Sequence, residues 1–239
     1  MAIERSIRRK SFRKRATSNT GTFRVLIVLL ILIPIGFYFI PSSIRTAFID
    51  YQLGRANEKL NRISQARKYY GSSYEASNKT NIMARLKYAE MSNKLGKFNE
   101  VYTLTTNLIE NKVGDDIFLS QVYLQQGLAN EGMELFEAAL ISYNTGAKLD
   151  SENYFVLIGL GRMYRIEGDY KKSRGYLEDA VSLRKLRAPD AHYELGLTYL
   201  AEKNNTDALD EFEYCLRQLP SRELKNKAQQ KKIDIMAGP

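Results

Sequence analysis

The chain has few of the side chains that most enzymes and metalloproteins use for catalysis or metal binding. Its 239 residues include one cysteine, one histidine and no tryptophan. A single cysteine excludes an internal disulfide, and without a cluster of cysteines and histidines nothing suggests a zinc site. No glycine-rich loop suggests phosphate binding. The composition therefore favours a protein that works without a metal or another cofactor.

A catalytic role could fall only on a few side chains. His192 and Cys215 would form a nucleophilic pair if they touched, but no acidic residue is evident to orient the histidine, and both fit packing positions. Asp115 and Asp116 fit a helix N-cap better than a metal site, because no further carboxylates cluster near them. We therefore expect no enzymatic activity, with no catalytic, cofactor-binding or metal-binding residue.

The low proline content points to one fold class. Only five prolines occur, and long stretches lack the alternation of apolar and polar residues that is typical of strands. Apolar residues make up 44% of the chain, which is enough for one continuous core. These features predict an all-α protein.

A self-similar pattern recurs five times after residue 46. A small residue marks each copy, at spacings of 35, 38, 34 and 35 residues: Gly54, Ala89, Gly127, Gly161 and Gly196. A second small column follows twelve positions later: Ala66, Val101, Ala139, Ser173 and Ala208. Four positions further stands a ring or its substitute: Tyr70, Thr105, Tyr143, Leu177 and Phe212. A helical pair of this length cannot bury its own apolar face, so the copies must stack as an α-solenoid.

The last two copies carry the pattern most completely. The fourth offers Leu160, Gly161, Tyr164, Gly168, Tyr170 and Ala180, and the fifth offers Leu195, Gly196, Tyr199, Ala208, Phe212 and Pro220. Together with the spacing, these residues resemble the tetratricopeptide repeat over about residues 47–220. Copies one to three depart further from it, no copy has the tryptophan of the family's first helix, and the extra residues in "NKVGDD" predict an extended loop before the third copy.

An uncharged stretch runs from Val25 to Ile40, close to the length of a membrane-spanning helix. Residues 1–24 hold eight basic side chains and one acidic one, which account for +7 of the net charge of +9. Because basic flanks resist translocation, the sequence predicts a single-pass membrane protein with a cytoplasmic N-terminus and an extracytoplasmic repeat domain, facing the periplasm of a bacterium. A cleaved signal peptide is the alternative.

The predicted organisation has four parts: a basic cytoplasmic tail (1–22), a transmembrane helix (23–43), a solenoid of about five helical hairpins (44–220) and a C-terminal capping helix (221–239). The basic tail could also bind anionic lipid or nucleic acid. The sequence argues against a nucleic-acid partner, since the tail lacks interleaved aromatic residues and a known nucleic-acid-binding motif. The simpler interpretation of its arginines is that they set topology.

The resemblance implies protein partners that bind the concave face lined by the first helix of each hairpin. Positions two, five, nine and twelve of each copy would face this groove, and they supply our candidate partner-binding residues: Tyr51, Arg55, Leu86, Leu124, Leu128, Phe155, Ile158, Arg162, Arg165, Tyr193, Leu197 and Leu200. Such a surface suits a peptide segment or an amphipathic helix with apolar anchors and some acidic residues. The alternative is that several of these leucines pack against adjacent helices.

The sequence thus predicts a non-catalytic, membrane-anchored scaffold that organises a protein complex of the cell envelope. One alternative is a chaperone-like accessory to protein translocation or secretion, which would bind many unfolded segments transiently. Another is a cytosolic adapter of reversed topology. One branch of the family holds a C-terminal carboxylate with Lys, Asn and Arg side chains, but this chain has other residues there: Tyr51, Arg55, Lys87, Gln121 and Gln125.

Overall fold

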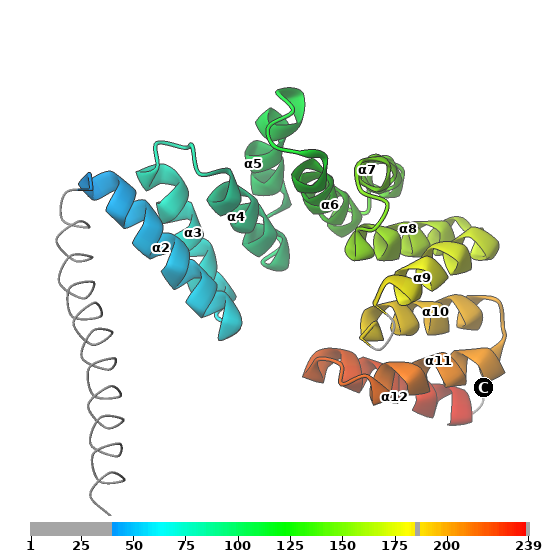
Figure 1. The fold of residues 1–239 in the computed structure, drawn as a ribbon. Helices are drawn as coiled ribbons and strands as arrows, with labels where there is room; N and C mark the ends of the chain where they lie inside the picture. The colour runs from blue at the N-terminus through cyan, green and yellow to red at the C-terminus, as the bar shows by residue number, and fades with distance from the viewer. Residues whose placement is uncertain (1–39, 185–186, 238–239) are drawn as a thin grey trace, which may run out of the picture.

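The computed structural model describes residues 40–184 and 187–237, and within them every regular element is an α-helix. The eleven helices follow one another through short turns (Figure 1). In chain order they are α2 (Ser42–Lys59), α3 (Ile63–Ala76), α4 (Ile82–Lys94), α5 (Phe98–Glu110), α6 (Asp116–Gly132), α7 (Phe136–Leu149), α8 (Tyr154–Glu167), α9 (Tyr170–Arg184), α10 (Pro189–Ala201), α11 (Asn205–Arg217) and α12 (Arg222–Ala237).

The helices pair into five hairpins, α2–α3 to α10–α11, and α12 follows the last. Each second helix also packs against the first helix of the next hairpin, so the hairpins stack in one continuous row. Figure 1 shows this row as an arch, with α4, α6 and α8 on its inner side and α5 and α7 on its outer side. The predicted all-α solenoid of helical hairpins is therefore confirmed.

The two helices of a hairpin can approach closely because the small residues of the first helix (the small column, such as Gly196) face the rings of the second helix or their substitutes (the ring column, such as Phe212). A Cβ atom added to Gly196 would lie 2.7 Å from Cε1 of Phe212, a distance that packed atoms do not tolerate. Tyr143 is enclosed more tightly, because Gly127 of its own hairpin and Gly159 of the next both lie against its ring. Ala89 and Thr105 occupy the two columns in the second hairpin, so a larger residue in one column goes with a smaller one in the other.

The turn inside each hairpin uses one residue with a positive φ angle at the same repeat position. Gly96 and Gly168 fill this position in two hairpins, with φ angles of 70° and 84°. Asn61, Glu134 and Lys203 fill it in the other three, with φ angles of 55°, 61° and 62°. Side chains with a Cβ are strained there, and glycine is not. The turn geometry is thus set by the packing of the two helices and is imposed on whichever residue occupies the position.

The extra residues before the third hairpin lengthen a helix and do not form the extended loop that the sequence predicts. Helix α6 has 17 residues, against 13 in α4, and it begins directly after Asp115. The Asp115 side chain accepts a hydrogen bond from the backbone N–H of Phe118 at 2.7 Å, as an N-cap does. The cap allows α6 to start one turn earlier in the repeat than α4 does, so the extra residues become part of the helix.

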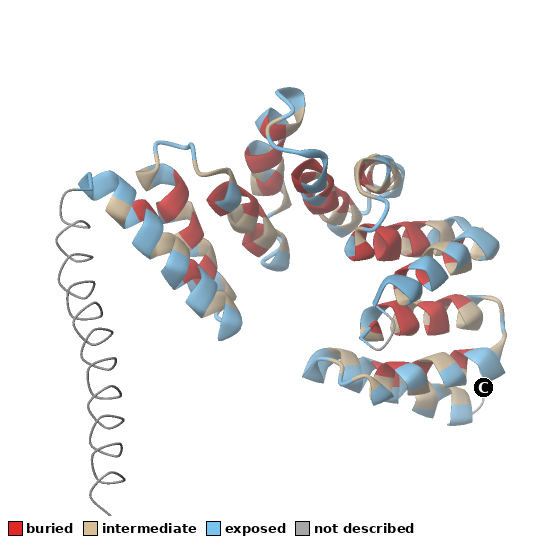
Figure 2. Ribbon diagram, viewed as in Figure 1, coloured by how far each residue is buried: buried red, intermediate tan, exposed pale blue. Residues whose placement is uncertain are grey.

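The C-terminal end of the row is covered by a polar helix. Ala228 of α12 is fully buried against Phe212 and Cys215, whereas most other residues of α12 are exposed (Figure 2). At the other end, α2 exposes a row of large apolar side chains, including Ile44 and Ile49. The row is therefore closed by a polar surface at one end only, within the residues that the structure describes.

The predicted membrane location is not supported. No helix among residues 40–184 and 187–237 is both long and apolar enough to cross a bilayer. Even α2, the longest with 18 residues, carries Arg45, Asp50 and Arg55. The stretch Val25–Ile40 lies outside the described residues, apart from Ile40, as do the basic tail and the first part of the proposed anchor. The prediction of a single-pass protein with extracytoplasmic repeats is therefore wrong on this finding.

Candidate partner-binding groove

The first helices of the hairpins lie closer together than the second helices. Helix α4 contacts α6, α6 contacts α8, and α8 contacts α10, whereas the second helices of successive hairpins make little or no contact. A row of hairpins that is tighter along one side must curve toward that side. The first helices therefore line the concave surface, as the repeat pattern predicts.

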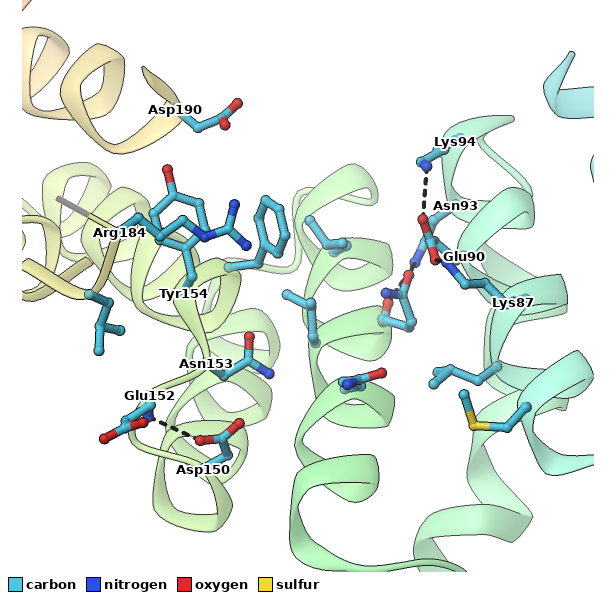
Figure 3. A pocket seen from close by; sticks show the side chains of 18 of the residues that line it. Lys87, Glu90, Asn93, Lys94, Asp150, Glu152, Asn153, Tyr154, Arg184 and Asp190 are labelled. Atoms are coloured by element: carbon cyan, nitrogen blue, oxygen red, sulfur yellow. Dashed lines mark hydrogen bonds and ion pairs between the residues drawn. The ribbon is translucent and has the colours of Figure 1, made fainter. Parts of the chain in front are cut away.

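A groove of about 1060 Å³ lies on this surface between α4, α6 and α8 (Figure 3). A volume of this size is at the upper end for small-molecule pockets and suits a segment of another chain. Its walls combine apolar side chains with amide and charged ones. The lining includes residues of α4 (Leu86, Lys87, Glu90, Asn93, Lys94), α6 (Gln121, Leu124, Gln125, Leu128), the turn before α8 (Asp150, Glu152), α8 (Tyr154, Phe155), the end of α9 (Leu183, Arg184) and the start of α10 (Asp190).

Four of the predicted groove residues line this cavity. Leu86 and Leu124 are buried and form its apolar floor, and Leu128 is half-buried beside them. Phe155 is 47% exposed, which is high for a ring on a packed helix. An exposed aromatic ring next to buried leucines offers a contact for an apolar side chain of a partner.

The α4 wall is polar and internally paired. The Asn93 side-chain amide donates hydrogen bonds to the backbone carbonyl and to Oε1 of Gln125, at 2.8 and 2.9 Å, and so joins α4 to α6. Lys87 and Lys94 both form ion pairs with Glu90, each at 2.8 Å. Burial alone would raise the pKa of Glu90, but hydrogen bonds from the two lysines outweigh it and lower that pKa. Lys87 also pairs with Glu58 of α2 at 3.1 Å, so both lysines of this wall have carboxylate partners.

The two arginines predicted to face a ligand are used within the fold. Arg162 forms a two-point ion pair with Glu131 of the neighbouring hairpin, with both nitrogen–oxygen distances at 2.8 Å. Arg165 pairs with Glu194 of the hairpin on the other side at 2.7 Å. Burial raises the pKa of Glu194, and the two guanidinium groups counter part of that rise. These four side chains join α6, α8 and α10 across the concave surface, which we call the ion-pair ladder.

The remaining predicted residues lie outside the groove. Ile158 is buried in the core with Leu177 and Leu195, so it cannot contact a ligand. Tyr51 is half-buried, and its ring lies 5.6 Å from the ring of Tyr70, while Arg55 is exposed on α2. Three others are half-buried against the core that α11 and α12 complete: Tyr193, Leu197 and Leu200.

Sequence reasoning missed most of the polar lining. Glu90 and Asn93 occupy repeat positions at which it selected leucines, and Gln121 occupies the position of Phe155, so the repeat register could have found them. Arg184 gave no such signal, because it lies at the end of a second helix and reaches the groove from the side.

The histidine and the cysteine have structural roles. Nδ1 of His192 lies 2.7 Å from Oε2 of Glu211, and Nε2 lies 3.1 Å from the side-chain amide of Gln218. The other end of that amide accepts a hydrogen bond from the backbone N–H of Ala188, before α10. Cys215 is fully buried, and burial raises the pKa of its thiol to about 12, so it is not an activated nucleophile. Among the described residues no group of acidic, histidine and cysteine side chains could hold a metal ion.

The comparisons with known proteins agree with this architecture. Residues 156–223 match the family model described as tetratricopeptide repeat. Over these residues the chain is similar to the tetratricopeptide repeat family. This family's fold suggests protein or peptide partners, and its members are generally non-catalytic scaffolds. No curated protein matches the chain in sequence.

Two solved structures show the same fold at low identity. A thermophilic tetratricopeptide repeat protein of Thermus thermophilus, TTC0263, is 19% identical and has a TM-score of 0.65; the match covers 79% of this chain and 100% of that one. MamA (41-end) from Desulfovibrio magneticus RS-1 is 13% identical and has a TM-score of 0.54, with 76% and 96% covered. At such identities the likeness concerns the fold alone.

Proposed function

We propose that the chain is a non-catalytic scaffold that binds a segment of another protein in the groove between α4, α6 and α8 and so helps to organise a protein complex. The observation that carries this proposal is the groove itself, because a volume of about 1060 Å³ lies on the concave surface of a repeat fold that generally binds proteins.

The lining supports a protein segment as the ligand. Its floor is apolar, and both lysines of its α4 wall are paired with carboxylates, those of Glu90 and Glu58. Gln121 of α6 is exposed and lines the groove. Apolar anchors with a few polar contacts are typical of peptide grooves, whereas a phosphate or metal site would need an excess of charge. Cys215 and His192 are both engaged in packing, so they add no catalytic chemistry.

Photo-crosslinking tests the proposal. A benzoylphenylalanine residue is placed at Gln121, in the groove, in the full-length chain in its native cells, and a matched one is placed at Glu137, an exposed residue of α7 outside the groove. We expect discrete crosslinked partners from position 121 and few from position 137. Equal crosslinking from both positions would contradict a groove site. A continuous smear from position 121 would favour the chaperone-like alternative over the scaffold.

A further inference from the structure

Arg184 differs from the other two cations that line the groove, Lys87 and Lys94, because it has no carboxylate partner among the described residues. Lys87 and Lys94 pair with Glu90, and the arginines of the ion-pair ladder pair with Glu131 and Glu194. Arg184 lines the groove and is exposed, yet it forms no ion pair with any residue that the structure describes. Its guanidinium charge is therefore available to a ligand.

Two aromatic rings hold this guanidinium in place. Its central carbon lies 3.8 Å from the ring centre of Tyr154 and 4.9 Å from that of Phe155. The Tyr154 ring is itself fixed, since it is buried and its hydroxyl accepts a hydrogen bond from the backbone N–H of Ala191. Stacking engages the face of a guanidinium and leaves the N–H donors around its edge free. Because these contacts already restrict the side chain, binding a carboxylate costs less conformational entropy.

We propose that Arg184 binds the carboxylate of an acidic side chain in the partner segment. The segment would place an Asp or Glu against the edge of the guanidinium and an adjacent apolar side chain against Phe155 and Leu183. This inference rests on the proposed function, since it names the chemistry of the segment that the groove binds. The source of the carboxylate is a side chain within the segment, because an apolar contact lies directly beside Arg184 in the groove.

The acidic residues of the lining decide where this carboxylate can lie. Asp150 and Glu152 lie on the same side of the groove as Arg184, but beyond Tyr154 and Asn153 (Figure 3). Asp190 of α10 lines the same end as Arg184 but forms no ion pair with it. A ligand carboxylate at Arg184 would therefore meet mild repulsion from Asp190. Removing the charge of Asp190 should strengthen the binding of an acidic segment.

Peptide selection on the purified full-length chain tests the inference. A phage-displayed library of random 12-residue peptides provides the probes, and selected peptides are then synthesised and titrated. We expect them to carry an acidic residue next to an aromatic or aliphatic one. Replacing that acid by its amide should weaken binding to the native chain by roughly tenfold, as expected for a charge-assisted hydrogen bond. It should have little effect on binding to R184Q, whose affinity for the acidic peptide is already reduced.

Matched variants separate a specific role from a structural one. Arg187→Gln removes the same charge from the same turn but does not line the groove, and it should leave the dissociation constant within about twofold of the native value. D190N should lower that constant for acidic peptides and not for their amide versions. Circular dichroism of each variant verifies the fold, and R184K keeps the charge without the planar stack, so it should give an intermediate affinity.

Two results would overturn the inference, and they differ from failure of the proposed function. If peptides bind but lack an acidic residue, or if R184Q and R187Q weaken peptide binding equally, the groove binds segments without a specific contact between Arg184 and a carboxylate. If no peptide is selected and none binds at millimolar concentration, both the inference and the peptide-binding groove are rejected.

Discussion

The two halves of the concave surface use the same repeat positions in opposite ways. Along α6, α8 and α10, which we call the closed half, Arg162 and Arg165 form the ion-pair ladder with Glu131 and Glu194. In the open half, which faces the groove, the corresponding positions of α4 and α6 hold Glu90, Asn93 and Leu128, and only the fourth residue, Glu131, belongs to the ladder. The difference shows that one register of a solenoid can stabilise the stack or be left for a ligand, depending on what the neighbouring hairpin supplies.

The largest expected effect on stability comes from disrupting the ion-pair ladder of the closed half. Arg162→Met would leave Glu131 without its two-point partner and would remove one of the two cations beside Glu194. Because the partly buried Glu131 then keeps the hydroxyl of Tyr143 but no cation, we expect a loss of about 3 kcal/mol in the free energy of unfolding, measured by urea denaturation. The matched change in the open half, Arg184→Met, should cost less than about 1 kcal/mol, since only ring contacts are lost. Equal losses would mean that the halves do not differ in this way.

A smaller effect concerns the paired wall of the open half. Glu90→Gln removes the carboxylate paired with Lys94 and one of the two paired with Lys87, and we expect a loss of about 1 kcal/mol at neutral pH. The pKa of Glu90 is lowered in the folded chain, so its contribution is present above the unfolded-state value of about 4.3 and is lost as pH falls below it. Unfolding titrations from pH 7 to pH 3 should therefore show the native chain and E90Q converging at acidic pH. A constant difference would show that the charge of Glu90 is not the cause.

The hairpin turns test whether the same backbone geometry holds in both halves. Gly168→Ala, in the closed half, places a Cβ at a φ angle of 84° and should destabilise the chain by about 1 kcal/mol. Glu134→Gly, in the turn after α6, relieves a φ angle of 61° and should be neutral or stabilise by a few tenths of a kcal/mol, since glycine also loses more chain entropy on folding. Thermal unfolding of both variants distinguishes these signs. Destabilisation by E134G comparable to that of G168A would contradict the strained turn.

The smallest expected effect on stability comes from blocking the open half. Gln121 is exposed, so Gln121→Trp should change the free energy of unfolding by less than about 0.5 kcal/mol while its large ring occupies the groove. Selected peptides should bind this variant at least tenfold more weakly than the native chain. Glu137→Trp, on α7, is the control and should bind them normally. Unchanged binding to Q121W would place the site elsewhere.

The fold could be predicted from the sequence because its determinants recur at one spacing. Gly127 facing Tyr143, and Gly196 facing Phe212, are readable as columns, and these pairs set the distance between the helices of a hairpin. The insertion before α6 could not be placed, because its effect depends on whether Asp115 caps a longer helix or remains in a loop.

The groove could be predicted only in part, because the repeat register gives the face of a side chain and not its neighbours. Leu124 and Phe155 do line the cavity, but the role of Arg162 depends on Glu131, which lies 31 residues away on the adjacent hairpin. Arg184 lies outside the first-helix register, so only the assembled structure shows that it reaches the groove beside Tyr154.

Hydrogen–deuterium exchange of the full-length chain with and without a selected peptide tests the central claim most directly. If the groove between α4, α6 and α8 is the binding site, the peptide should slow exchange in these first helices and at the junction of α9 and α10, while α3, α5 and α7 remain unchanged. Protection confined to the second helices, or spread evenly over the chain, would contradict the account.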